Sequence, residues 1–354
     1  MSKNNYHILG VMSGTSLDGI DVAELAFSLS EDQVWDFKIL HAETIAYSDS
    51  WKSRLKEAIS FSEAELQQLN STYTQFLAEV ISAFIKKQGI QGLDAVCSHG
   101  HTILHRPDQG ITLQIGNLPE LATRIRQTVV CDFRVQDVAL GGQGAPLVPI
   151  GDRLLFGEYD HCLNLGGFAN VSSEMNGNRI AHDICPVNIV LNPFAEKLGK
   201  PYDEGGELAA QGIVNPALLR QLNSLPYYKI APPKSLGLEW VKEFIFPLLN
   251  DSGLSNMDIL STCTEHIAMQ IADRCREGVS VLVTGGGAYN DYLISRIQTI
   301  KNMRLIRPTP EIIEFKEALI FGLLGVLKLR NEVNCLSSVT GAQKDHSCGI
   351  IYFP

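Results

Sequence analysis

Residues 13–21, near the N-terminus, include two glycines, three residues with hydroxyl side chains and two aspartates. These residue types are suited to forming turns and to binding phosphate or metal ions. Glycine lets the backbone approach a ligand closely, and consecutive N–H groups in a tight turn form a concavity that suits an anion. The hydroxyls can donate hydrogen bonds to phosphoryl oxygens, and carboxylates are the hard oxygen ligands that Mg²⁺ takes directly or through water. The stretch therefore indicates either a phosphate and magnesium site or an ordinary hairpin loop.

Two further glycine turns follow apolar, strand-like runs, at Gly166-Gly167 and at Gly285-Gly286-Gly287. Ligands bind at strand ends in α/β sheets, so three such turns favour a shared ligand. The pattern differs from G-x-x-x-x-G-K-[ST] and from the dinucleotide pattern G-x-G-x-x-G. It fits a nucleotide held in a cleft between two lobes.

Two carboxylates stand at the ends of apolar runs. Asp183 ends the expected strand 179–184, where a carboxylate has no role in a core; it is either a functional carboxylate or a solvated aspartate at a strand end. Asp132 and Arg134 follow the apolar run 128–131 in the same way. They form either a local ion pair or part of a binding site, in which arginine can grip a carboxylate with two hydrogen bonds.

Three histidines, His99, His101 and His105, and the late acid Glu317 complete the candidate side chains. Alternate residues of a strand share a face, so His99 and His101 could converge on a metal. Because neither Cys nor a carboxylate joins them at ligand spacing, we favour a structural or substrate-binding role for His99. Glu317 is either an acid in the first turn of a helix or a substrate contact.

Size and composition limit the classes of protein. A chain of 354 residues, 45% hydrophobic and 19% charged, is long enough for two globular domains. Apolar runs stay short of a membrane span, and the N-terminus lacks the apolar core of a signal peptide, so we expect a cytoplasmic protein. The net charge of −10 argues against nucleic acid and anionic membranes as partners. Eight cysteines without a C-x-x-C pair are expected to be buried or free thiols.

Hydrophobic periodicity predicts a duplicated α/β chain. In the first half, Ser62-x-x-Glu65 is a capping box that opens a helix ending at Gly89. In the second half, Thr262-x-x-Glu265 is expected to open another helix, and strand, glycine turn, strand recurs as a weak repeat. The expected strands are 6–12, 21–29, 34–40, 43–47, 94–98, 111–115, 128–133, 161–165, 169–174, 179–184 and 279–283, and further helices are 118–127, 150–156, 293–300 and 312–329.

Several blocks together resemble the anhydro-N-acetylmuramic acid kinases, members of the sugar kinase–Hsp70–actin superfamily. The resemblance runs in order along almost the whole chain. It rests on residues 11–21, 98–102, 112–116, 132–134, 141–149, 164–167, 232–235, 285–287, 317–318 and 339–342.

The resemblance implies an actin-like ATPase with two ribonuclease-H-like lobes and an interlobe cleft. The N-terminal lobe would comprise residues 1–136, with 337–354 returning to it, and the C-terminal lobe 137–336. The implied reaction opens 1,6-anhydro-N-acetylmuramic acid with water while ATP phosphorylates O6, giving the 6-phosphate used in cell-wall sugar recycling. The apolar helices of the second lobe fit a core or a homodimer face equally well.

The resemblance also assigns roles to residues. Asp183 would be the catalytic base, and Asp18 would position Mg²⁺, directly or through water. ATP would contact Gly14, Thr15, Ser16, Leu17, Asp18, Gly19, Ile20 and Asp21, then Gly166 and Gly167, with Gly285, Gly286 and Gly287 against the adenosine. The sugar would contact His99, Asp132, Arg134 and Glu317.

Beside Asp183 the chain departs from the family pattern Asp-Thr-Gly-Pro-Gly-Asn. Ile184, Cys185 and Val187 replace threonine and two glycines, and a glycine of positive φ could not become valine without strain. Two alternatives follow: a related kinase for another sugar, or an ATP-binding homologue that has lost catalysis.

Overall fold

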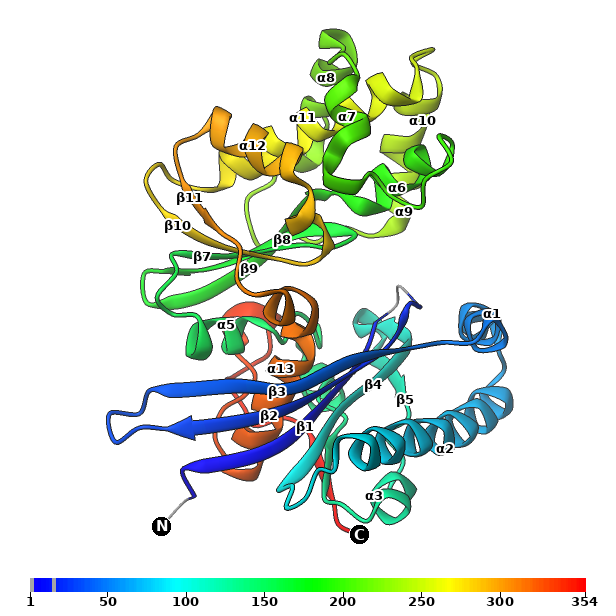
Figure 1. Ribbon diagram of the computed structural model, residues 1–354, viewed down its shortest axis with the longest axis vertical. Helices are drawn as coiled ribbons and strands as arrows, with labels where there is room; N and C mark the ends of the chain where they lie inside the picture. Colours follow the sequence, from blue (N-terminus) through cyan, green and yellow to red (C-terminus); the bar gives the residue numbers. More distant parts are fainter. Residues whose placement is uncertain (1–2, 15–16) are drawn as a thin grey trace. The chain divides into compact units, whose positions relative to one another are not determined.

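The computed structural model describes residues 3–14 and 17–354 (Figure 1). Its contacts divide the chain into two compact units. The first unit comprises residues 1–155 and 315–354, and the second comprises residues 156–314. The C-terminal segment 337–354 thus belongs to the same unit as the N-terminus. Residues 137–155 and 315–336, which we expected in the C-terminal lobe, also have most of their contacts in the first unit.

The first unit is built on a mixed sheet. Its strand order is β12-β6-β4-β1-β2-β3, with β5 paired to β4. β2 is antiparallel to both β1 and β3, whereas β4 is parallel to β1 and to β6. The two strands predicted at 34–40 and 43–47 are one continuous strand. The bounds are β1 (Asn5–Ser13), β2 (Gly19–Leu29), β3 (Trp35–Ala46), β4 (Ala95–Arg106), β5 (Ile111–Ile115), β6 (Val129–Cys131) and β12 (Ile350–Tyr352).

The sheet of the second unit repeats this plan. Its order is β11-β10-β7-β8-β9, in which β8 is antiparallel to both neighbours and β10 is parallel to β7 and β11. The same pairing of three antiparallel and two parallel strands confirms the predicted duplication. The bounds are β7 (His161–Leu165), β8 (Phe168–Met175), β9 (Asn178–Pro186), β10 (Ser280–Thr284) and β11 (Arg304–Ile306).

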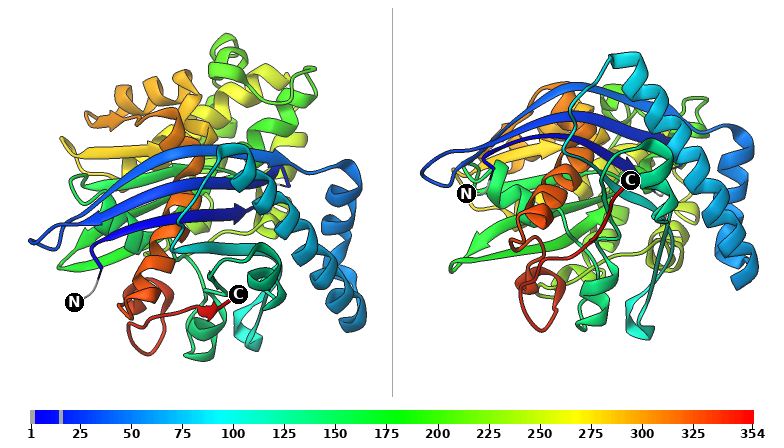
Figure 2. Two further views of the ribbon diagram at one scale, coloured as in Figure 1. Left: turned by 60° about the horizontal axis from the view of Figure 1, so that its bottom comes forward. Right: turned by 90° about the horizontal axis from the view of Figure 1, so that it is seen from below.

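Two long helices cover opposite faces of the first sheet, α2 (Glu63–Gln88) and α13 (Pro310–Leu329) (Figure 2). Successive side chains of a strand alternate between faces, so Leu9 packs into the cluster that includes α2. Gly10 faces α13, where an added Cβ would lie 2.2 Å from the carbonyl oxygen of Ala318. Glycine is therefore needed for this close approach of helix and sheet.

The sequence signals at the two ends of α2 are confirmed. The Ser62 hydroxyl accepts from the Glu65 N–H, and the Glu65 carboxylate accepts from the Ser62 N–H. Gly89 ends the helix in the left-handed conformation, with φ of 67°.

The same signal at Thr262 was misleading. Helix α11 (Asn256–Arg274) begins earlier, where Ser255 caps its first turn. The Thr262 hydroxyl instead donates to the Asp258 carbonyl and accepts from the Asn215 N–H. The remaining α-helices are α1 (Asp49–Glu57), α3 (Glu120–Ile125), α4 (Val135–Ala139), α5 (Pro149–Leu155), α6 (Asn188–Glu196), α7 (Glu207–Gln211), α8 (Pro216–Asn223), α9 (Leu238–Trp240), α10 (Phe246–Asn250), α12 (Asp291–Ile300) and α14 (Ser337–Thr340).

Two further expectations concern the whole chain. All eight cysteines are buried and free of disulfides, as predicted. In the part of the chain that the structure describes, every helix is too short or too polar to cross a membrane.

Candidate active site

The loop after β1 begins with a side chain that is already engaged inside the first unit. The buried Ser13 hydroxyl lies 2.6 Å from the Tyr47 hydroxyl and 2.8 Å from His101 Nδ1. Burial lowers the pKa of His101 to about 4, so its ring is neutral near pH 7. Ser13 thus anchors the loop to β4, contrary to the expectation that it donates to phosphate. Thr15 and Ser16 lie outside the described residues.

The described remainder of the loop presents one exposed carboxylate. Asp18 is exposed, whereas Ile20 is fully buried in the core, so only the main chain of Ile20 is available to a ligand. Leu17 has φ of 62°, and its N–H donates to the Gly14 carbonyl. At Gly19 an added Cβ would lie 2.5 Å from the Ile45 carbonyl oxygen, so glycine permits the pairing with β3.

Asp21, on β2, is half-buried and accepts a hydrogen bond of 2.6 Å from the Thr44 hydroxyl. Its carboxylate is close enough to Glu317 to raise the pKa of that acid. The second aspartate of the loop therefore lies near one of the predicted sugar-binding residues.

Arg134 and His99 contact each other at the start of α4. Arg134 Nε donates to His99 Nε2 over 2.9 Å, and His99 Nδ1 donates to the Gly100 carbonyl over 2.9 Å. Burial, and secondarily the positive charge of Arg134, holds the pKa of His99 well below its usual range. Arg134 Nη1 donates to the Gly144 carbonyl, while Nη2 has no hydrogen-bond partner among the described residues. A positioned guanidinium thus keeps donors for an anionic ligand.

Glu317 lies two turns inside α13, so the first-turn interpretation is wrong, because the helix dipole acts only near the helix end. Its side chain is solvent-accessible. Desolvation nevertheless raises its pKa, and the neighbouring Arg134 partly offsets this. The structure therefore brings Glu317 close to Arg134, as a shared sugar site requires.

Asp132 has a left-handed backbone with φ of 60°, which is uncommon for a residue other than glycine. Its carboxyl is partly buried, and desolvation raises its pKa. Within the described residues Asp132 and Arg134 do not form the local ion pair that was one interpretation. Arg134 contacts His99 and Gly144 instead.

In the second unit, the two predicted nucleotide-binding glycine turns lie side by side. An added Cβ at Gly285 would lie 2.6 Å from Asn164 Oδ1 and 2.9 Å from the Leu165 backbone, directly before Gly166. Gly285 also has φ of 79°. The carbonyl of Gly167 accepts from the Val187 N–H over 2.8 Å, which joins this turn to the start of α6.

Asp183 lies inside β9, not at a strand end as predicted. The register shifts beside it, because Ala169 pairs with Cys185 and Asn170 with Asp183, leaving Ile184 unpaired. Such a bulge changes the direction of neighbouring side chains. Asp183 Oδ2 accepts from the Leu236 N–H over 2.8 Å. The half-buried carboxyl has a pKa raised by desolvation and partly lowered by this hydrogen bond.

A connected set of groups supports Asp183 from the segment after α8. The Tyr227 hydroxyl donates to the Asp183 carbonyl over 2.7 Å, and the Asp183 N–H donates to the Lys234 carbonyl over 3.1 Å. Lys234 Nζ donates to the Tyr227 carbonyl and lies 4.3 Å from the Tyr227 ring centroid. Both sides of the Asp183 backbone are thereby fixed to one loop.

The substitutions beside Asp183 are core residues. Ile184, Cys185 and Val187 are each at most 1% exposed and belong to the hydrophobic core of the second unit. Val187 has φ of −125° and ψ of −99°, which is not left-handed but lies outside the main allowed regions of the backbone. The expected strain of a left-handed valine is therefore absent at this position.

Sequence comparison gives matches over the whole length. The family model "Anhydro-N-acetylmuramic acid kinase" matches residues 6–354. The chain belongs to this family. An anhydro-N-acetylmuramic acid kinase of Bacillus cereus (strain AH187) is 34% identical over 98% of this chain and 99% of its own. A Vibrio cholerae protein of the same name is 33% identical over 98% of each chain.

Solved structures give weaker likenesses. A ligand-bound xylulose kinase from Lactobacillus acidophilus has a TM-score of 0.45 at 12% identity, over 99% of this chain and 94% of its own. The activator of a 2-hydroxyisocaproyl-CoA dehydratase from Clostridium difficile, with bound ADPNP, has a TM-score of 0.44 at 13% identity, over 92% and 96%.

The sequence did not predict the supporting residues of this candidate site. Tyr227 and Lys234 act through main-chain contacts, which leave no pattern of their own. Asp137 is fully buried in the first unit and accepts the Gly144 N–H over 2.6 Å, so it holds the carbonyl that orients Arg134. A charged residue between the Asp132-Phe133-Arg134 and glycine-rich blocks was the available signal.

Proposed function

We propose that this kinase converts 1,6-anhydro-N-acetylmuramic acid, ATP and water into N-acetylmuramic acid 6-phosphate and ADP, within the recycling of peptidoglycan sugars. The observation that carries the proposal is Asp183. It is a half-buried carboxylate with a raised pKa, held by one backbone N–H in a chain of this family. A base of moderately raised pKa suits proton abstraction from water.

The chemistry divides between a water molecule and a phosphoryl group. Asp183 removes a proton from the water that attacks the anomeric carbon, and the bond from that carbon to O6 breaks. The released O6 attacks the γ-phosphorus of ATP, and ADP leaves with the electron pair of the broken P–O bond. Phosphoryl transfer of this kind depends mainly on positioning and on neutralisation of charge.

The nucleotide contacts that we propose lie on glycine turns. In the second unit the adjacent turns at Gly166-Gly167 and Gly285–Gly287 would bind ATP through their backbone. In the first unit the loop of residues 14–21 would bind phosphate. Its exposed carboxylate at Asp18 would hold Mg²⁺, which supplies positive charge to the phosphates when bound.

The sugar contacts that we propose lie around Arg134. Its Nη2 would donate to the lactyl carboxylate, with His99 keeping the guanidinium in place. Glu317 and Asp132 would accept hydrogen bonds from sugar hydroxyls. Because the reaction consumes ATP, we expect the enzyme to act in the cytoplasm.

The first test is an ADP-release assay with two acceptors. We expect turnover with 1,6-anhydro-N-acetylmuramic acid and little with N-acetylmuramic acid, which lacks the bond to be opened. Faster turnover with the plain sugar would overturn the hydrolytic step, while turnover only with a different anhydro-sugar would identify the related kinase.

The second test follows the oxygen of water. Short reactions in ¹⁸O-water are expected to give one label on the anomeric carbon of the 6-phosphate, with unlabelled phosphate oxygens. Unlabelled 6-phosphate incubated alone in the same water measures spontaneous exchange. A product no more labelled than this control would exclude hydrolytic opening, and ATP binding without any product would identify a silent homologue.

A further inference from the structure

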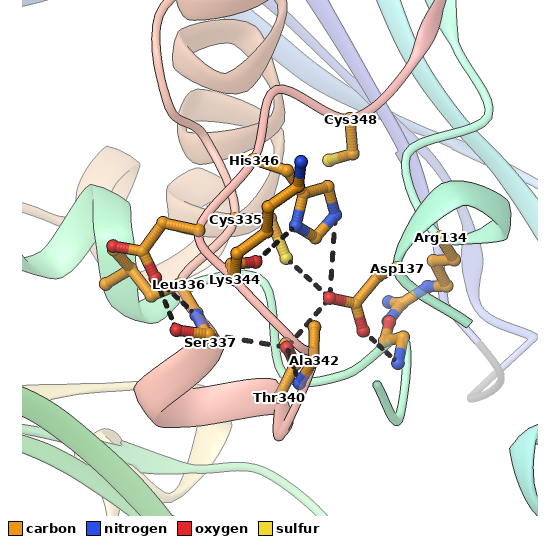
Figure 3. Close-up of polar contacts among 12 residues, drawn as sticks. Arg134, Asp137, Cys335, Leu336, Ser337, Thr340, Ala342, Lys344, His346 and Cys348 are labelled. Carbon is orange, nitrogen blue, oxygen red and sulfur yellow. Dashed lines mark hydrogen bonds and ion pairs between the residues drawn. The ribbon is translucent and has the colours of Figure 1, made fainter. Parts of the chain in front are cut away.

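A second group of chemistry-bearing side chains lies in the first unit, between α4 and the C-terminal segment (Figure 3). The Sγ atoms of Cys335 and Cys348 and one ring nitrogen of His346 lie within 4.8 Å of one another, and all three residues are buried. The fully buried Asp137 points its carboxylate at the same place. Its Oδ1 is 3.0 Å from Cys335 Sγ and 3.6 Å from His346 Nε2. Two thiols, an imidazole and a carboxylate therefore converge.

The orientation of His346 is the second, independent observation. Its Nδ1 donates to the Lys344 carbonyl over 3.1 Å, so Nε2 is the ring nitrogen that remains for another partner. Nε2 is buried and has no hydrogen-bond partner among the residues that the structure describes. The nearest group opposite is the Asp137 carboxylate, which is an acceptor. Asp137 Oδ1 already accepts from the Thr340 hydroxyl over 2.7 Å and from the Cys335 thiol, so His346 Nε2 is the atom of this pair without a hydrogen bond, and a cation placed between the two atoms would bind both.

We propose that Asp137, Cys335, His346 and Cys348 bind one Zn²⁺ ion. Cys sulfur, His nitrogen and Asp oxygen are all zinc ligands, and four of them can give the tetrahedral coordination of a structural site. A backbone carbonyl that accepts the second ring N–H is the usual support for a zinc-binding histidine. This site goes beyond the proposed function, because neither the sugar nor the nucleotide contacts include these side chains.

The separations of Asp137 from two of the other ligands are close to those of this coordination, and the remaining three ligand atoms lie within 4.8 Å of one another. Bond lengths of about 2.0–2.3 Å around a tetrahedral ion place neighbouring ligand atoms about 3.3–3.8 Å apart. The 3.6 Å and 3.0 Å contacts of Asp137 Oδ1 bracket the lower end of that range.

Zinc binding would replace two thiol hydrogen bonds. In the structure the Cys335 thiol donates to Asp137, and the Cys348 thiol donates to Asn334 Oδ1 over 3.0 Å. Both thiols lose a proton to solvent as the ion binds, so binding weakens as the pH falls. Arg134 is an electrostatic neighbour of Asp137, Cys335 and Cys348 and offsets the negative charge that remains.

The ion would support the proposed sugar site through the hydrogen bonds that link Asp137 to Arg134. Asp137 accepts the Gly144 N–H through Oδ2, and the Gly144 carbonyl accepts from Arg134 Nη1. Cys335 and His346 are already joined by two backbone hydrogen bonds of 3.1 and 3.2 Å. A zinc ion would lock this C-terminal hairpin to α4 and so restrain Arg134.

The test measures metal in the full chain purified without chelators. Elemental analysis is expected to give about one zinc per chain, and cobalt substitution should give thiolate charge-transfer and tetrahedral d–d absorption. The variants Cys335→Ser and His346→Gln should lose most of the zinc. The matched control is Cys263→Ser, because Cys263 is also a buried free thiol but lies in the second unit; it should keep the zinc.

Two measurements keep the test decisive if a variant fails to fold. Chelated wild-type protein should melt at a lower temperature and recover when Zn²⁺ alone is added back. Denatured, chelated protein should titrate as eight thiols, one for each cysteine. Zinc-free native protein that also fails to gain stability from added Zn²⁺, or a count of six thiols from a Cys335–Cys348 disulfide, would overturn the proposal.

Discussion

Asp183 owes its proposed reactivity to its surroundings. A carboxylate in water has a low pKa and is a weak base, and desolvation raises the pKa of Asp183 above its ordinary value. The Leu236 N–H limits this rise because it stabilises the charged form. The net rise in the pKa of Asp183 makes its ionised form a stronger base than an exposed aspartate, which favours proton abstraction from water.

This environment makes a prediction for the pH dependence of kcat/KM. The base must be ionised, so activity should fall as the pH drops through the raised pKa of Asp183 in the free enzyme. Asp183→Glu should displace this acidic limb, whereas Glu317→Gln should leave it in place. Rate profiles of the three proteins test this assignment, and a limb moved only by Glu317→Gln would assign the base to Glu317 instead.

At this scale the sequence predicted side-chain identity better than side-chain direction. Asp183 was identified from the resemblance to the family, and its place at the end of an expected apolar strand supported the assignment. The bulge at Ile184 depends on pairing with β8, so local sequence could not predict it. Ser13 has the residue type of a phosphate ligand, yet its hydroxyl contacts Tyr47 and His101, which are distant in sequence.

Among the elements, glycine turns bring backbone segments into contact where a side chain would separate them. Gly285 and Gly278 share a φ of 79°, but only Gly285 has atoms within 4 Å of an added Cβ. The two positions therefore differ in steric exclusion, which acts only at Gly285.

We predict different effects for Gly285→Ala and Gly278→Ala. Both should lose stability because of the positive φ, by about 1–2 kcal/mol at Gly278 and by about 1–3 kcal/mol at Gly285, whose φ of 79° and ψ of 164° are open essentially only to glycine. Gly285→Ala must in addition move Asn164 or Leu165, so its dissociation constant for ATP should rise about tenfold or more, a change of about 1.4 kcal/mol. Calorimetric titration with ATP tests this, and equal ATP affinity in both variants would count against the Gly285 turn as a nucleotide contact.

Two helix-capping patterns of the same type predicted helix starts, and only one of them was correct. Ser62-x-x-Glu65 caps α2, whereas Thr262-x-x-Glu265 lies within α11. The second pattern failed because Ser255-x-x-Asp258 lies upstream, and the buried Thr262 hydroxyl found partners on the backbone of its own helix and of residue 215. A cap pattern indicates where a helix can start, and tertiary packing selects among the candidates.

For the whole molecule, the sequence indicated the repeated strand order only through a weak repeat of strand, glycine turn and strand. The parallel strands β4, β6, β10 and β11 join each sheet through connections too long for local patterns to specify. Family resemblance covered this gap, because ordered motifs along the chain imply the shared topology.

Neutral buried histidines in both units predict that stability falls in acid. Burial lowers the pKa of His101 to about 4 and of His266 to about 3, while an unfolded histidine has a pKa of about 6.5. Below that value the unfolded chain binds protons that the folded chain does not, so stability decreases as the pH falls from 6.5 toward 4. Each residue should cost roughly 2 kcal/mol at pH 5.

Urea unfolding at pH 7 and pH 5 tests this linkage. The midpoint should be lower at pH 5, and His266→Gln should reduce the difference between the two pH values. A wild-type midpoint that is higher at pH 5 than at pH 7 would contradict the assignment of these histidines as neutral.

The central claim is that Asp183 activates water while other residues bind ATP, and Asp183→Asn tests it most directly. The amide keeps the size of the side chain and can still accept from the Leu236 N–H, so the fold and nucleotide affinity should persist. Single-turnover measurement with 1,6-anhydro-N-acetylmuramic acid should show a rate lowered about 10³-fold, with the dissociation constant for ATP nearly unchanged. A variant that turns over at the wild-type rate would contradict the account.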